Sequence, residues 1–146
     1  MSNSETNLNN ALDALQSRIG QSNTASDWFE VTQDRIDGFA EVTMDHQWIH
    51  VDVEKAKSGP FGEPIAHGHL TLSIMGHLPK TERVPGPKLE GQKLSINYGF
   101  DKVRFPSPVP VGAQIRATST LKRAEIKGGM IETMNEVVVE VKGQDK

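Results

Sequence analysis

The sequence predicts an α+β fold in which helices come first and an antiparallel sheet follows. Apolar residues recur at helical spacing in the first half of the chain, whereas the second half contains extended runs at 93–105, 113–125 and 130–141. Gly128-Gly129 separates the last two runs and is a typical hairpin signal. Strands that follow helices in this way indicate an α+β arrangement in which an antiparallel sheet packs around a helix.

The composition is that of an ordinary soluble protein with one core. The chain has 146 residues, of which 36% are hydrophobic and 24% are charged. Its net charge of -3 arises from 16 basic and 19 acidic residues that are spread along the chain, so a nucleic-acid partner is not expected. The absence of cysteine excludes disulfides, thiolate metal ligands and a cysteine nucleophile.

Neither a leader nor a membrane span is expected from the pattern of apolar residues. Residues 1–20 lack a basic end followed by an apolar run, and no stretch of the sequence reaches the roughly 18 to 20 apolar residues of a transmembrane helix. We therefore expect a cytoplasmic protein that does not interact with membranes.

An amphipathic helix is predicted at the start of the chain. Ser4 or Thr6 is a suitable cap and Gly20 a suitable end. Its apolar stripe consists of Leu8, Leu12, Leu15 and Ile19. The stripe must contact either the following domain or a second subunit. We expect residues 1–22 to form this helix and a linker, and residues 23–146 to form a single domain.

The middle of the chain predicts a capped helix, a long structured loop and a buried helix. Thr32 caps a helix that ends just before Asp45. The buried face of this helix is predicted to be Ile36, Phe39 and Ala40. The loop at 45–64 contains a short helix at 53–57, and the stretch 65–78 is apolar nearly all round, as in a buried central helix.

An acid and an imidazole lie five residues apart at Asp45 and His50, after the predicted end of the first capped helix. A carboxylate that accepts a proton and an imidazole that holds or gives one form a minimal acid–base pair near neutral pH. The pattern alone leaves a second interpretation open, in which Asp45 caps the following turn and His50 is a half-buried polar residue.

Gly68 opens the predicted central helix. The first N–H groups of a helix have no internal partner, so Gly68 offers a donor to an oxygen that gains negative charge. The alternative is that the glycine allows helix and sheet to pack closely. His67 and His69 raise the question of a metal site, but residues two apart on a helix point to different sides and no ligand motif accompanies them. No metal is expected.

Two cations follow in the extended run at 93–105. On a strand, Lys102 and Arg104 share one face, while Val103 and Phe105 share the other. The two cations could hold phosphate groups, although such residues more often form a solvated strand face.

These motifs resemble the MaoC-like (R)-specific enoyl-CoA hydratases over roughly residues 28–124. The family signature reads Gly-Asp-x-Asn-Pro-aliphatic-His, and its Asp and His are the catalytic dyad. The matching positions are Asp45, Ile49 and His50, and the departures are Met44 for glycine, Gln47 for asparagine and Trp48 for proline. The glycine that donates to the thioester oxygen in the family matches Gly68.

The resemblance implies a hot-dog fold, in which an antiparallel sheet wraps around a central helix, here with an extra N-terminal helix. It implies (R)-specific, reversible hydration of trans-2-enoyl-CoA to (R)-3-hydroxyacyl-CoA. In that reaction, Asp45 accepts a proton from a water, His50 orients the water and protonates the α-carbon, and Gly68 stabilises the oxyanion. The residues assigned to substrate binding are Gln47, His67, Lys102 and Arg104.

The resemblance also implies a homodimer whose substrate carries coenzyme A, with no separate cofactor. Two other functions remain open at this point. The first is an acyl-CoA thioesterase on the same fold, which works with one carboxylate and without the histidine. The second is a non-catalytic module that binds acyl-CoA, because a fold does not fix a function.

Overall fold

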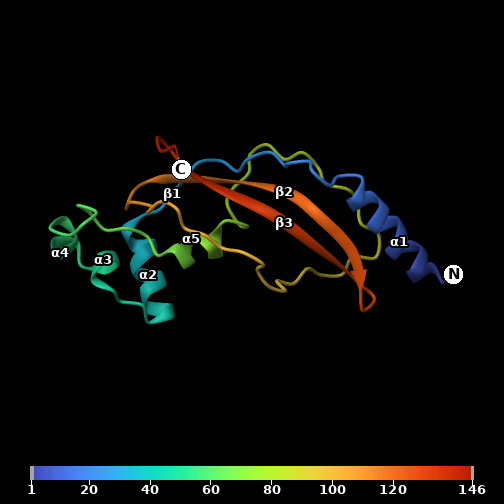
Figure 1. The fold of residues 1–146 in the computed structure, drawn as a ribbon, viewed down its shortest axis with the longest axis horizontal. Helices are drawn as coiled ribbons and strands as arrows, with labels where there is room; N and C mark the ends of the chain where they lie inside the picture. The colour runs from blue at the N-terminus through green and yellow to red at the C-terminus, as the bar shows by residue number, and fades with distance from the viewer. Residues whose placement is uncertain (1, 146) are drawn as a thin grey trace. The chain divides into compact units, whose positions relative to one another are not determined.

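The computed structural model describes residues 2–145 and contains five helices and a three-stranded sheet among them (Figure 1). The helices are α1 (Asn3–Gln16), α2 (Gln33–Thr43), α3 (Trp48–Val51), α4 (Val53–Lys57) and α5 (Gly68–Ile74). The strands are β1 (Phe29–Glu30), β2 (Gln114–Lys127) and β3 (Met130–Val141), in the order β1-β2-β3. Helices followed by an antiparallel sheet confirm the predicted α+β class. None of the described helices is both long and apolar enough to cross a membrane.

The chain divides into two compact units, each built from several segments. The first contains the chain up to Ala25, Glu82–Val103 and Thr118–Val138. The second contains Ser26–Thr81, Arg104–Ala117 and the chain from Val139 onward. The division expected after residue 22 stays a prediction.

In the first unit, α1 begins earlier than predicted. Ser2 is its cap rather than Ser4 or Thr6, because the Ser2 hydroxyl accepts from the Glu5 N–H while the Glu5 carboxylate accepts from the Ser2 N–H. The helix is joined to β2 by a hydrogen bond of 3.1 Å from the Gln16 amide to the Ala124 carbonyl.

The predicted hairpin is confirmed. Gly128 and Gly129 connect β2 to β3 with φ angles of 57° and 77°. Two successive positive φ angles characterise the tight turn whose twist matches that of the flanking strands, and glycine adopts them without steric cost.

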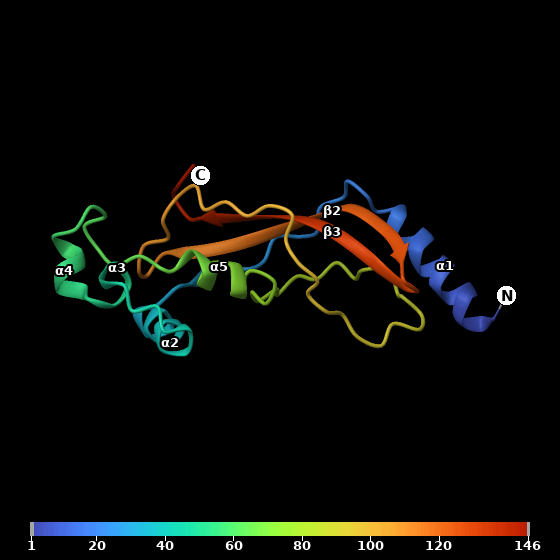
Figure 2. The same cartoon turned by 60° about the horizontal axis from the view of Figure 1, so that its bottom comes forward.

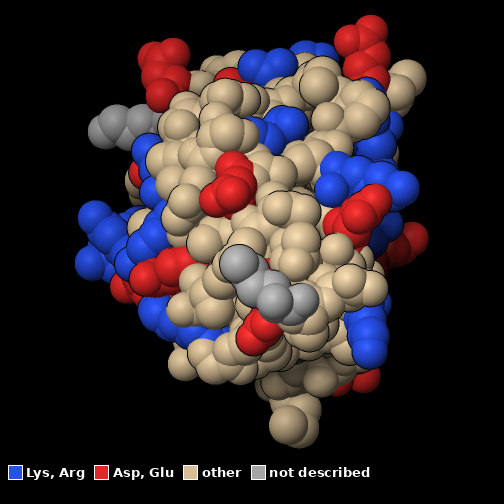
Figure 3. All heavy atoms as spheres, turned by 90° about the vertical axis from the view of Figure 1, so that its right-hand side faces the viewer, with Lys and Arg blue, Asp and Glu red and all other residues tan. Residues whose placement is uncertain are grey.

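On the face shown in Figure 3, basic and acidic side chains are interspersed over a largely uncharged surface.

The strand predicted at 93–105 is wrong for this structure. The segment is irregular, and no described strand pairs with it. Four side chains at alternate positions of the segment, Leu94, Ile96, Tyr98 and Phe100, are between 61% and 87% exposed. The apolar alternation is therefore present without the partner that a strand requires.

In the second unit, α2 is capped as predicted. The Thr32 hydroxyl accepts from the Arg35 N–H, and the buried positions are Ile36 and Ala40. The short helix predicted at 53–57 is confirmed as α4, with Asp52 as its cap. Figures 1 and 2 show α2, α3 and α4 as neighbours, in agreement with their contacts.

The central helix is shorter than predicted, and it is not buried all round. Ile65 forms a β-bridge with Pro110, and the Ala66 N–H donates to the Val109 carbonyl, so this part of the predicted helix is extended instead. The helix begins at Gly68, where its buried residues are Leu70 and Thr71. Its other faces include the exposed residues His69 and Ser73.

Candidate active site

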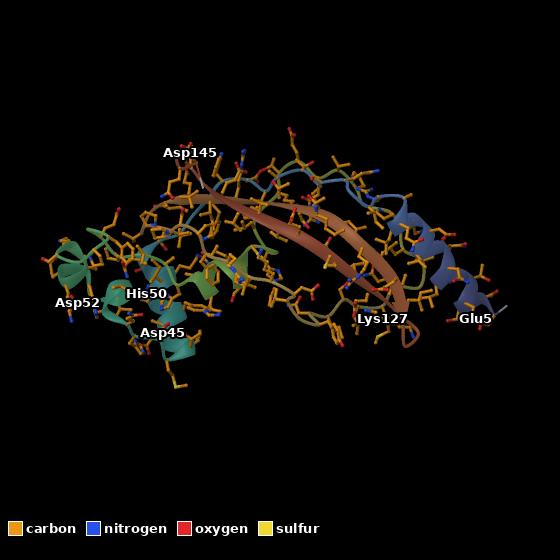
Figure 4. All side chains as sticks on the ribbon, viewed as in Figure 1. Glu5, Asp45, His50, Asp52, Lys127 and Asp145 are labelled. Carbon is orange, nitrogen blue, oxygen red and sulfur yellow. The ribbon has the colours of Figure 1, made fainter. Side chains whose placement is uncertain are left out.

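Asp45 lies directly after α2, where the chain makes a left-handed turn. Met44 ends the helix with a φ of 63°, the one positive φ of a non-glycine residue in the described chain. The Asp45 side chain is exposed, and its Oδ1 accepts from the Gln47 N–H at 3.3 Å. Asp45 therefore has a local capping role and also presents a carboxylate beside α3 (Figure 4).

His50 is the buried member of the pair. It lies in α3, its side chain is 6% exposed, and its Nδ1 is 2.6 Å from the Ile65 carbonyl oxygen. A carbonyl oxygen only accepts, so Nδ1 carries a proton and donates it to this bond. In the neutral ring, Nε2 therefore has a free lone pair. The Gln33 amide of α2 donates to the His50 carbonyl at 2.8 Å and holds α3 in place.

His67 joins the two residues of the pair. It is 2% exposed, its ring stacks on that of His50 with centroids 3.8 Å apart, and its Nε2 donates to the Asp45 carbonyl at 2.9 Å. The Phe39 ring of α2 lies 4.9 Å from the His67 ring. A carboxylate oxygen of Asp45 and one ring nitrogen each of His50 and His67 all lie within 4.8 Å of one another.

Burial is the main influence on the charge of His50. Loss of solvent lowers the pKa of the imidazole, and the nearby His67 lowers it further. The hydrogen bond to Ile65 and the carboxylate of Asp45 oppose this, but the pKa stays below its ordinary value of 6.5. His50 is therefore neutral at neutral pH and able to accept a proton.

The same three side chains have the types of donor atom that bind metal ions. A carboxylate and two imidazoles are suitable groups, but one nitrogen of each ring is already bonded to a main-chain carbonyl. The planes of the two rings are only 25° apart, so their remaining lone pairs run along nearly parallel planes rather than toward one ion. This geometry fits a metal poorly, and the expected absence of a metal stays a prediction.

Gly68 is the first residue of α5, and its N–H has no acceptor among the described residues. A Cβ at this position would lie 2.9 Å from two carbons of the Phe105 ring. Both interpretations of this glycine therefore have support, because the N–H is available as a donor and the missing side chain leaves room for Phe105.

The other expected substrate residues lie outside this cluster. Gln47 contributes its main chain, which accepts from the His50 N–H at 3.0 Å, while its side chain is exposed. Lys102 and Arg104 are exposed, and they share no strand face because the segment is irregular. They also belong to different compact units, so their joint role stays a prediction.

Sequence reasoning missed the groups that hold the pair in place. Gln33, Phe39 and the Ile65 carbonyl contact His50 or His67 through long-range packing, and no local pattern marks them. His67 was expected in the site, but its contacts with both members of the pair had no sequence signal beyond its position beside Gly68.

A buried imidazole with a lowered pKa beside a carboxylate is an arrangement that is able to carry acid–base chemistry. The model of the family described as MaoC like domain matches residues 14–143. The chain therefore belongs to the MaoC-like domain family, which confirms the expected family and the expected hydratase or dehydratase class.

Comparisons with individual proteins agree with this family assignment. The 3-hydroxyacyl-thioester dehydratase Z of Mycobacterium tuberculosis strain H37Rv is 46% identical over 134 residues, which cover 91% of this chain and 83% of the relative. The structure of the monoamine oxidase regulatory protein from Archaeoglobus fulgius is 26% identical with a TM-score of 0.69, over 85% of this chain and 80% of that one. The (R)-hydratase from A. caviae involved in PHA biosynthesis is 24% identical with a TM-score of 0.55, over 84% of this chain and 95% of that one. These likenesses confirm the hot-dog fold.

Proposed function

We propose that the protein catalyses the reversible, (R)-specific hydration of a trans-2-enoyl-CoA to the (R)-3-hydroxyacyl-CoA. The observation that carries the proposal is the pairing of Asp45 with a buried, neutral His50, one of whose nitrogens is already occupied by the Ile65 carbonyl. The mycobacterial relative is named for the dehydration of a 3-hydroxyacyl thioester, which is the same reaction in reverse.

The tautomer of His50 suggests the path of the proton. Neutral His50 takes a proton from water on Nε2 while the water oxygen bonds to the β-carbon. The electron pair of the double bond moves toward the thioester oxygen, where the Gly68 N–H stabilises it. The imidazolium then gives its proton to the α-carbon on the same face and becomes neutral again, so atoms and charge balance and the addition is syn.

This path changes the role that the sequence suggested for Asp45. The carboxylate orients the water and stabilises the imidazolium, rather than taking the proton itself. Acid–base help contributes about 10² to 10⁴ in rate and one oxyanion donor about 10² to 10³, so the three groups together account for a large acceleration. Substrate CoA carries the acyl group, and no further cofactor enters the proposal.

The remaining proposals concern the CoA carrier, the assembly and the location. Gln47, Lys102 and Arg104 are proposed contacts of the substrate, with the two cations directed at phosphate groups. A homodimer is proposed because a second copy would cover the apolar residues that the first unit exposes. The cytoplasm is the proposed location.

The decisive experiment follows the loss of enoyl absorbance with crotonyl-CoA and identifies the product by chiral analysis. The (R)-3-hydroxy product supports the proposal. Release of free CoA thiol from acyl-CoA without hydration would instead support the thioesterase. Binding of a saturated acyl-CoA with no turnover of crotonyl-CoA would support the non-catalytic module.

A further inference from the structure

His67 contacts both members of the proposed catalytic pair. Its Nε2–H donates to the main-chain carbonyl of Asp45 at 2.9 Å, and its ring lies on the His50 ring with 3.8 Å between centroids. The side chain is buried, so solvent does not compete for either contact. One residue thus links the main chain of the acid to the ring of the base.

The surroundings of His67 favour one orientation of its ring. Phe39 packs against the ring from α2 at an interplanar angle of 57°. With the proton on Nε2, the buried Nδ1 carries a lone pair that has no partner among the described residues. A proton on Nδ1 would be buried there without an acceptor, so this packing satisfies the tautomer that carries its proton on Nε2.

We propose that His67 is a positioning residue for the hydration proposed above, on which this inference rests. Its hydrogen bond fixes the main chain that carries Asp45, and its stacked ring fixes the plane of His50, so that both groups face the same water. This role differs from the substrate contact that the sequence suggested, because His67 acts through the pair and not on the acyl group.

His67 also affects the charge of His50. Burial and the neighbouring His67 both lower the pKa of His50, whereas the Asp45 carboxylate raises it. The α2 residues in contact with the two histidines, Gln33 and Phe39, are uncharged. On α4, which contacts α3, Lys57 pairs with Glu54 at 2.7 Å and Lys55 lies over the Trp48 ring.

Two substitutions separate the two contacts of His67. His67→Phe keeps a flat ring but removes the N–H donor, whereas His67→Gln keeps an N–H donor but removes the ring. We expect each to lower kcat for crotonyl-CoA by about tenfold or more, with KM changed by less than about threefold, because the geometry of the pair is lost rather than the binding of substrate. The control is His77→Gln, since His77 is an exposed histidine outside the cluster.

The pH profile provides a readout that a structural defect does not move. Hydration requires neutral His50, so activity falls as the pH drops through the pKa of His50. Without His67 this pKa rises, and we expect the acid limb of kcat to move to higher pH in both variants and to stay in place in His77→Gln. Loss of folded protein alone would lower the whole profile without moving the limb, and that outcome would overturn the proposal.

Two further outcomes are informative. A rise in KM with unchanged kcat would overturn positioning in favour of substrate contact. A wild-type protein without hydration activity would overturn the proposed function itself and with it the role of His67. If the variants do not fold, nitrogen-15 NMR of the wild-type histidines decides the matter, because the proposal requires the Nε2–H tautomer of His67 and is overturned by the Nδ1–H tautomer.

Discussion

The loop at 45–64, which carries the proposed catalytic pair, and the segment Glu82–Val103 differ in how far their side chains are buried and hydrogen-bonded. The buried ring of His50 in the loop and that of His67 at the start of α5 each bond to a main-chain carbonyl. In the segment, alternate apolar side chains are more than 60% exposed, as at Ile96 and Tyr98. The loop is held by caps and by bonds to nearby elements, whereas an extended segment needs a partner strand or a covering surface.

The largest effect is expected from the pair itself. Asp45→Asn and His50→Gln should each lower the turnover of crotonyl-CoA by at least about a hundredfold, because each removes a group that handles the proton or its charge. His46→Gln is the matched control, since His46 is exposed and its contact is an ion pair with Glu41 at 3.6 Å. Near-normal rates in either variant of the pair would contradict the mechanism.

Substitution of Gly68 should lower both turnover and stability, and the two effects can be separated. Gly68→Ala places a methyl group 2.9 Å from the Phe105 ring, so the ring must move, and turnover should fall about tenfold or more because the donor site is obstructed. Phe105 is 49% exposed, which allows the ring to turn away at a moderate loss of stability. Melting curves and initial rates of the same preparation provide the two measurements.

The double variant Gly68→Ala, Phe105→Ala distinguishes packing from catalysis. Removal of the ring should restore the melting temperature that the methyl group lowered, while turnover should remain low because the methyl group still lies beside the donor. Recovery of both quantities would assign Gly68 to packing alone and leave the thioester oxygen without a donor.

Substitution of an exposed apolar residue should have a weaker effect, which concerns the formation of the proposed dimer and depends on protein concentration. Ile96→Asp should shift the protein from dimer to monomer in light scattering, because a charge in a covered apolar surface is left without a partner. Val84→Asp is the control, since Val84 is similarly exposed but precedes the alternating positions. A wild-type protein that is an active monomer would refute the dimer directly.

The smallest effect is expected at Met44. Its φ of 63° is strained for a side chain with a Cβ, and the residue is 84% exposed. Met44→Gly should therefore raise the free energy of unfolding by about 0.5 to 1 kcal/mol, after the greater flexibility of glycine in the unfolded chain is included. Denaturant unfolding measures the change, and a loss of stability would show that Met44 makes favourable contacts.

Met44 also shows where a departure from the family signature is informative. Glycine is usual at this position in the family that the sequence resembles, and the left-handed turn supplies the reason. The turn brings Asp45 out of α2 and toward α3, so the position before the acid needs this backbone conformation whichever residue occupies it.

Local chemistry in the sequence was sufficient for much of the fold. The cap at Thr32, the short helix at Val53–Lys57 and the turn at Gly128-Gly129 follow from nearby residues alone. The α+β class followed from the order of periodic segments, and the candidate acid and base followed from their spacing. These features depend on interactions within a few residues, which a sequence displays directly.

The tertiary structure decided the rest. The extended conformation of Ile65 and Ala66, which shortens α5, depends on partners more than forty residues away at Val109 and Pro110. The tautomer of His50 depends on the Ile65 carbonyl, and its low pKa depends on burial. The sequence by itself determined which residues could carry the chemistry, whereas their protonation and mutual orientation came from long-range contacts that no local pattern encodes.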